Sequence, residues 1–149
     1  MRAIIQRVDE ARVIVGSDVI GSIDKGLLVL IAIGNLDLLE DVNWLVKKII
    51  NLRIFPDEKN LLHYSLVDIR GSILVVPQFT LYADLSQGRR PSYFDAAKPD
   101  HAKNMFDELI MLLKTNKDIA VQVGQFQAHM KVYSCNDGPV TLLLDSKDR

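Results

Sequence analysis

The sequence predicts an α+β fold in which two main helices pack on one side of mixed β-sheets. Strand-forming patterns open and close the chain, and two helical repeats of apolar residues lie between them. This order of elements favours a sheet covered by a layer of helices. The 149 residues show no change in composition and no linker, so we expect one domain over residues 1–149.

The N-terminal part of the chain is predicted to form four strands. Patterns near 2–8, 12–16 and 19–23 precede the apolar run GLLVLIAIG, which indicates a strand near 27–33 that is buried on both faces. This run is much shorter than the roughly 20 residues that cross a bilayer. The first ten residues are too polar for a secretory signal. We therefore expect a cytoplasmic protein with no membrane association.

Two amphipathic helices are predicted at residues 37–50 and 99–115, where apolar residues recur at helical spacing. Pro99 stands in the first turn of the second helix, where a missing N–H is tolerated. A short strand at 52–55 and a longer one at 72–82 lie between the helices.

Strand patterns return in the C-terminal part of the chain. Polar and apolar residues alternate from 125 to 133, which is typical of a half-buried strand, and residues 139–145 supply the last strand. Phe126 and Met130 fall on the apolar face of the alternating segment.

Composition excludes several classes of function. The formal net charge of −1 argues against a protein that coats DNA or RNA non-specifically, because such binding needs a dominant basic surface. A buried, unreactive position is expected for Cys135, the single cysteine. The three histidines share no metal-ligand spacing, and the familiar hydrolase motifs are missing. We therefore expect neither a metal nor another cofactor.

Two segments carry polar residues that simple packing does not explain. Gln78 and Thr80 end an apolar strand and need partners from the protein or from a ligand. Thr80 has no evident base and would be a poor nucleophile alone. Arg89 and Arg90 lie in the long connection 83–98, which is either a phosphate-contacting loop or a solvated tip.

A third segment places Gly138-Pro139 directly before the last strand. Proline lacks a backbone donor and glycine lacks a side chain, so the pair exposes carbonyl oxygens. It forms either a plain turn or a surface built from backbone.

The chain contains, in this order, the segments MRAIIQRV, GLLVLIAIG, LRIF, PQFTLYAD, GRRPS, GQFQAHM and NDGPVT. Together they cover essentially the whole chain and closely resemble the bacterial D-aminoacyl-tRNA deacylase family. The resemblance implies hydrolysis of the ester that joins a D-amino acid to the 3′ end of tRNA. Glycyl-tRNA, including tRNA(Ala) mischarged with glycine, is implied as a second substrate. A metal-independent cytoplasmic homodimer is also implied, with an α/β/β layered fold and a partly open, barrel-like core.

Individual roles follow from the same resemblance. The main-chain N–H groups of Gln78 and Phe79 would bind the ester carbonyl. Thr80 matches a residue proposed as nucleophile, and the alternative is that the 2′-hydroxyl of the tRNA assists the attack of water. Three residues match the pocket of the terminal adenosine, although core packing is the alternative for the two large ones: Ala97, Phe126 and Met130.

For Gly138-Pro139 the resemblance implies a cis bond and insertion into the active site of the partner subunit. The carbonyl oxygens would collide with an L side chain, whereas a D side chain would point away. Glycine has no side chain that could collide with them.

Two departures from the family pattern keep other functions open. Pro77, at a substrate-binding position, replaces the usual serine, and the NLLHYS stretch at 60–65 replaces a GKMN-like one. The alternatives are a deacylase with relaxed or altered stereospecificity and a non-catalytic module that binds RNA ends.

Overall fold

The computed structural model describes every residue from Met1 to Arg149. Its strands are β1 (Arg2–Val15), β2 (Asp18–Ile23), β3 (Gly26–Ala32), β4 (Phe55–Pro56), β5 (Leu62–Tyr64), β6 (Ser72–Pro77), β7 (Ala120–Val123) and β8 (Met130–Asp145). Its helices are α1 (Leu39–Asn51) and α2 (Pro99–Thr115), with two short 3₁₀ helices, η1 (Phe79–Tyr82) and η2 (Ser146–Asp148).

Strand β1 is the strand to which three others attach in the main sheet. Its first half pairs with β3 and its second half with β2, both in the antiparallel direction. Strand β8 pairs with β1 over nearly its whole length, also antiparallel. Beyond β3, strands β6 and β7 extend the sheet through parallel pairs, which makes the sheet mixed.

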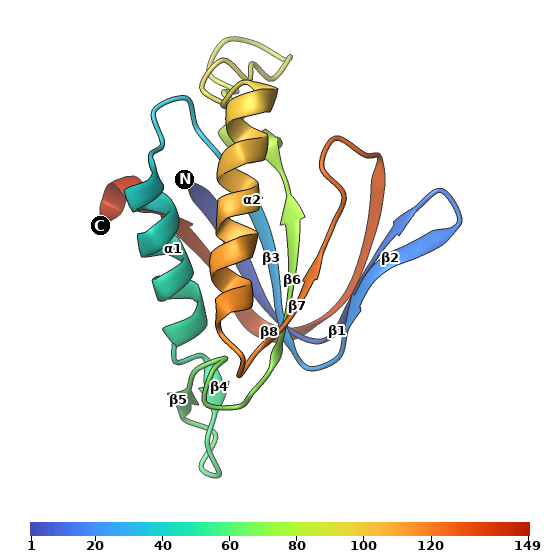
Figure 1. Cartoon of the computed structure of the whole chain (residues 1–149), viewed down its shortest axis with the longest axis vertical. Helices are drawn as coiled ribbons and strands as arrows, with labels where there is room; N and C mark the ends of the chain where they lie inside the picture. The colour runs from blue at the N-terminus through green and yellow to red at the C-terminus, as the bar shows by residue number, and fades with distance from the viewer.

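The main sheet curls until it nearly closes into a barrel, as Figure 1 shows. Strand β2 approaches β6 and β7 closely: a Cβ on Gly21 would lie 3.1 Å from the Leu74 side chain and 3.3 Å from the Val123 carbonyl oxygen. The order of paired strands leaves β2 and β7 unjoined, so the seam stays unsealed. The predicted α+β class and the partly open barrel-like core are confirmed.

Two apolar clusters hold the layers together. The larger cluster lies between the helices and one face of the sheet, and the smaller one packs on its other face. Helices α1 and α2 lie side by side on the outer face (Figure 1) and bury Leu45 and Leu109 completely. Burying a leucine contributes about 1.5–3 kcal/mol relative to leaving it exposed. Such contacts explain why the amphipathic patterns located both helices.

The predicted helices agree closely with the structure. Helix α2 has the predicted bounds, and α1 covers Leu39–Asn51 instead of 37–50. The start of α1 shifts because the Asp41 carboxylate accepts a hydrogen bond from the Leu38 N–H at 2.8 Å, which caps the first turn there.

Four predicted strands need correction. The patterns near 2–8 and 12–16 belong to one strand, β1, because β8 follows both across two register shifts. The strand predicted at 72–82 ends at Pro77, where the missing N–H suits the end of a ladder, and η1 follows. Of the strand predicted at 52–55 only Phe55 pairs, in β4 against the exposed and unpredicted β5.

The strand predicted at 125–133 is wrong for residues 125–129. These residues form a turn in which Gln127 has φ of 59°. Exposed and half-buried residues alternate along this turn at the edge of the pocket, which mimics the pattern of a strand. Strand β8 then extends from Met130 to Asp145, and β7 has no counterpart in the prediction.

The outer face of β8 is largely uncovered. Cys135 lies on it and is exposed, so the expected buried position is wrong. No helix of the structure is long and apolar enough to span a membrane.

Candidate active site

A pocket of about 550 Å³ opens where four segments meet: the ends of β3 and β6, the start of α2 and the turn before β8. A mostly apolar pocket of this size with a few polar groups is typical of a small-ligand site. Thr80 directly follows the pocket wall without lining it. The structure brings together six residues that the sequence predicted: Pro77, Gln78, Phe79, Ala97, Phe126 and Met130.

One end of the pocket is the turn that follows β6. The Gln78 N–H donates to the Ile31 carbonyl at 2.7 Å and so extends the pairing of β6 with β3. Helix η1 starts at Phe79, and the first N–H groups of a helical turn have no acceptor within it. The Gln78 N–H is therefore engaged in this structure, and its binding to the ester stays a prediction. Phe79 and Thr80 supply the N–H groups at the start of η1.

The Thr80 hydroxyl has no base beside it. The side-chain amide of Gln78 donates to this hydroxyl at 2.5 Å, and an amide N–H cannot accept a proton. No histidine or carboxylate is a hydrogen-bond partner of Thr80 in the structure. Its hydroxyl thus lacks the general base that activates a nucleophile.

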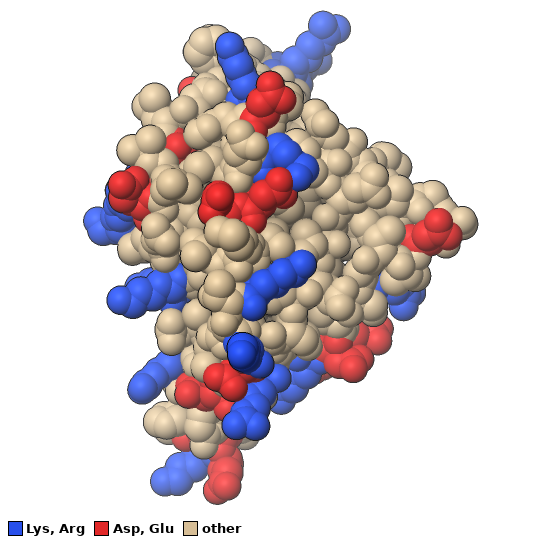
Figure 2. Space-filling model, viewed as in Figure 1, with Lys and Arg blue, Asp and Glu red and all other residues tan.

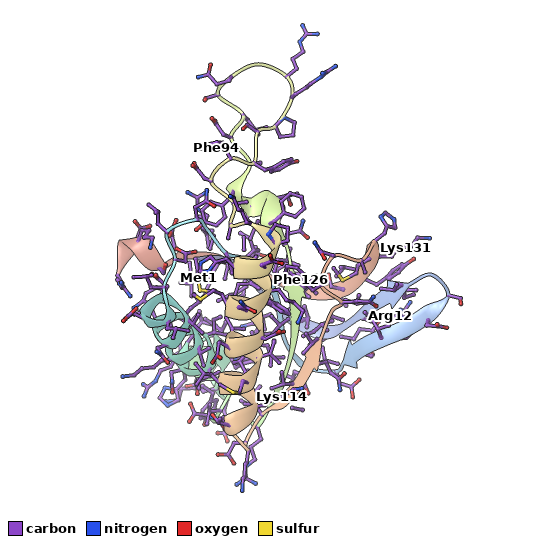
Figure 3. The ribbon with its side chains drawn as sticks, turned by 45° about the horizontal axis from the view of Figure 1, so that its top comes forward. Met1, Arg12, Phe94, Lys114, Phe126 and Lys131 are labelled. Carbon is purple, nitrogen blue, oxygen red and sulfur yellow. The ribbon has the colours of Figure 1, made fainter.

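The apolar wall of the pocket continues into the core. Phe126 lies beside α2 (Figure 3) and packs on Phe106 with 6.1 Å between ring centroids. Met130 passes so close to Gly124 that a Cβ there would lie 2.9 Å from the Met130 sulfur. Phe126 and Met130 each pack against a core cluster and also line the pocket, and their contact with the adenosine stays a prediction.

A third aromatic side chain at the pocket escaped the sequence analysis. Tyr93 lines the pocket and meets Phe79 edge to face, with 5.0 Å between ring centroids. Phe79 is 57% exposed, so this pair forms an open rim. The adjacent aromatics Tyr93 and Phe94 in the long loop were the available signal.

The Gly138-Pro139 peptide is cis, as the resemblance implied. Both residues are exposed and neither lines the pocket. Asn136 pairs with Val8 and Thr141 with Gln6, so the residues between them bulge out of β8. Asn136 is six positions after Met130 along the strand, which is about 20 Å at the usual rise. The pair therefore lies apart from the pocket of its own chain.

Side chains on both sides brace this bulge. The Asn136 amide donates to the Arg7 carbonyl at 2.8 Å and to the Val140 carbonyl at 3.3 Å. The Arg7 guanidinium, which is nearly buried, pairs with Asp137 at 2.7 Å and donates to the Ile54 carbonyl at 2.5 Å. Sequence reasoning missed Arg7 because its partner lies 130 residues away.

The loop between η1 and α2 projects beyond the body of the protein (Figure 1). Its base is a short antiparallel bridge, in which Asp84 and Ser92 exchange backbone hydrogen bonds of 2.7 and 2.9 Å. Gly88 permits the tight turn with φ of 92°, and Arg89 and Arg90 follow it in exposed positions. This bridge makes the base of the loop ordered, while its tip stays solvated.

Charges of both signs mix on the face shown in Figure 2. The structure gathers no group of three histidine, cysteine or carboxylate side chains that could hold a metal ion. The polar side chains that line the pocket are those of Gln78, Tyr93, Gln127 and His129, beside the backbone N–H groups at the start of η1.

Comparison with known proteins covers nearly the entire chain. The model of the family described as D-Tyr-tRNA(Tyr) deacylase matches residues 4–145. A D-aminoacyl-tRNA deacylase of Petrotoga mobilis is 51% identical over 147 residues, which are 99% of this chain and 98% of that protein. One of Clostridioides difficile is 50% identical over 146 residues, which are 98% and 97% of the two chains. A solved structure titled c-Myc DNA Unwinding Element Binding Protein has a TM-score of 0.91 and 36% identity, covering 97% of this chain and 98% of that one.

Proposed function

The chain belongs to the D-aminoacyl-tRNA deacylase family, and we propose that it performs this hydrolysis at a pocket completed by Gly138 and Pro139 of a second subunit. The activity is hydrolysis of the ester between a D-amino acid and tRNA. One observation carries the proposal: the pocket and the Gly-Pro pair lie apart within one chain, and both are accessible. We place the enzyme in the cytoplasm, where aminoacyl-tRNA is used.

The proposed substrate pose follows the chemistry of the pocket. The terminal adenosine lies against the apolar wall of Ala97, Phe126 and Met130. The ester carbonyl accepts hydrogen bonds from the Phe79 and Thr80 N–H groups, which stabilise the charge that develops on its oxygen when water attacks. Removing one such donor typically costs about 10²–10³ in rate.

In the proposed reaction, water adds to the ester carbon and the bond to the ribose 3′-oxygen breaks. The leaving oxygen takes a proton, and the products are the free amino acid and tRNA. Because Thr80 has no base beside it, we assign the activation of water to the neighbouring 2′-hydroxyl of the tRNA. Thr80 keeps a binding role through its backbone.

Selection by chirality is proposed to act through carbonyl oxygens of Gly138 and Pro139 from the partner subunit. They crowd the space that an L side chain would occupy, and exclusion needs no attractive contact with the D side chain. Glycine has no side chain to exclude, so glycyl-tRNA, including tRNA(Ala) mischarged with glycine, is a proposed second substrate.

The uncovered face of β8 supports a homodimer. Tyr133 and Leu143 on this strand are 46% and 65% exposed, although strand residues of this kind are usually covered. This face runs from the pocket rim to the Gly138 bulge. A two-fold axis across it would bring two pockets and two Gly-Pro pairs into equivalent positions.

Contacts with the tRNA backbone are proposed for Arg89 and Arg90. Both are exposed at the projecting loop, and arginine is well suited to phosphate oxygens. Charges are otherwise mixed (Figure 2), so these contacts would position the acceptor end without general affinity for nucleic acid, including DNA.

Pro77 favours a second candidate, a deacylase with relaxed stereospecificity. It lines the pocket where the family usually has serine, so a hydroxyl is absent there.

One assay compares release of amino acid from D-Tyr-tRNA, L-Tyr-tRNA and Gly-tRNA(Ala). The proposal expects fast release from the first and third only. Release from L-Tyr-tRNA at a comparable rate would favour the relaxed enzyme, and restored rejection in Pro77→Ser would assign the cause. Binding without release would indicate a non-catalytic module.

A further inference from the structure

Arg2 belongs to β1 and makes three contacts, of which two reach η1. Its Nη1 donates to the Leu81 carbonyl at 3.1 Å, and its guanidinium lies over the Tyr82 ring, 4.5 Å from the centroid. Its Nε pairs with Asp145 at 2.9 Å, which fixes the orientation of the guanidinium. Two of the four residues of η1 are thus held by one side chain.

Tyr82 is fixed on its other sides as well. A Cβ on Gly34 would lie 2.7 Å from the Tyr82 ring, so the ring lies against bare backbone there. The Tyr82 hydroxyl donates to Asp37 at 3.3 Å. Burial and the nearby carboxylates of Asp37 and Asp145 raise the pKa of Tyr82, which keeps this hydroxyl protonated. The ring is therefore confined between the Arg2 guanidinium and the Gly34 backbone.

Gly34, against which the Tyr82 ring lies, also connects η1 to the part of the pocket wall that Ala96 and Ala97 form. Gly34 forms a backbone bridge with Ala96, and the Ala97 N–H donates to the Ile33 carbonyl at 2.9 Å. Ala96 and Ala97 line the pocket, whereas Arg2 does not. Arg2 can act on a bound substrate only through the segments that it holds.

We propose that Arg2 is a positioning residue for deacylation, which holds η1 so that the Phe79 and Thr80 N–H groups face the ester carbonyl. This inference rests on the proposed role of that turn in binding the ester. A guanidinium is required, because it must stack on a ring and donate in two directions at once, and an ammonium cannot do both.

An ordinary surface ion pair would behave differently. The Arg2 side chain is 40% exposed, and exposed ion pairs contribute little to stability. If Arg2 served only its pair with Asp145, its loss would change neither the turn nor the rate constant. Lys103 offers a matched control, since it forms an exposed ion pair with Asp107 on α2 and does not line the pocket.

The test combines kinetics with amide hydrogen exchange in Arg2→Met, Arg2→Lys and the control Lys103→Met. For Arg2→Met we expect kcat on D-Tyr-tRNA to fall about tenfold, less than the loss of a whole oxyanion donor. KM should change less than about twofold, because adenosine and phosphate contacts remain. The peptide containing residues 78–83 should exchange faster. Arg2→Lys should resemble Arg2→Met, and the control should resemble the wild type.

Each outcome distinguishes this inference from the function on which it rests. Unchanged exchange in residues 78–83 would overturn the inference, whatever the rate. Faster exchange with an unchanged kcat would show that Arg2 holds the turn but that the turn does not act on the ester, which contradicts the proposed pose. The double variant Arg2→Met with Tyr82→Leu adds a second criterion. Expressed as free energies of activation, the losses in kcat of the two single variants should sum to more than the loss of the double variant, and a simple sum would overturn the coupling.

Discussion

Changing Gly138 to alanine tests whether this glycine serves its own subunit or another one. Within its own chain the added methyl group would meet only the Asn136 Oδ1, at 4.0 Å. The backbone of Gly138 is not in the left-handed region, which only Gly16 and Gly88 adopt among the glycines. At such a position alanine typically stabilises a protein by about 0.4–1 kcal/mol, because it restricts the unfolded chain.

Activity should nevertheless fall. If Gly138 lies in the pocket of the partner, the methyl group enters a space that already holds substrate. Overfilling a packed site costs about 1–3 kcal/mol. At 1.36 kcal/mol per factor of ten, kcat/KM for D-Tyr-tRNA should fall by roughly 5- to 150-fold.

Urea unfolding at one fixed protein concentration and initial rates on D-Tyr-tRNA provide the measurements. Gly16→Ala is a control, because its φ of 61° strains alanine although nothing lies within 4 Å of the new methyl group. It should lower the free energy of unfolding by about 1–2 kcal/mol and leave kcat/KM unchanged. The reasoning is refuted if Gly138→Ala destabilises the fold as Gly16→Ala does, or if it leaves kcat/KM intact.

Three further changes test other parts of the account. Thr80→Val should keep most of the turnover, because the 2′-hydroxyl assists the water; a fall to background with tRNA binding intact would favour a Thr80 nucleophile. Arg89→Ala and Arg90→Ala should raise KM more than they lower kcat and weaken the salt dependence of kcat/KM; an unchanged salt slope would place both arginines away from RNA. Burial raises the pKa of Asp145, but hydrogen bonds from the Lys147 N–H and from Arg2 outweigh this and lower it overall. The stability from ionised Asp145 is therefore complete above its usual pKa of about 4 and is lost as pH falls below it. Arg2→Met should thus lower the urea midpoint more at pH 7 than at pH 3; equal losses would exclude the ion pair as the cause.

Sequence patterns located the elements whose burial is regular. Both helices were predicted within about two residues, because apolar spacing such as that around Leu45 and Leu109 reports directly which face is covered. The turn at 125–129 was misread as strand, because exposed and half-buried residues alternate along it as they do along a strand. Strand β5 was missed because its side chains are exposed and carry no pattern.

The pocket residues were found by motif, but the hydrogen bonds of the site were not. The resemblance assigned four residues to one site, and all four line the same pocket: Pro77, Phe79, Ala97 and Phe126. That the Gln78 N–H is already engaged follows only from the parallel pairing of β6 with β3. Long-range pairs, such as Arg7 with Asp137 or Arg2 with η1, join parts of the chain that no local pattern relates.

The central claim is that each pocket uses the Gly-Pro pair of the other subunit, and a mixed dimer tests it most directly. Gly138→Ala damages the pair, and Ala97→Trp fills the pocket, which Ala97 lines. In a dimer with one lesion on each chain, the unblocked pocket faces the intact pair of its partner. The account predicts about half of the wild-type kcat for this dimer. A dimer of one wild-type chain and one chain with both lesions should instead be nearly inactive on D-Tyr-tRNA, because its open pocket faces the damaged pair. The opposite ranking of the two dimers would show that the pair acts within its own chain and would contradict the account.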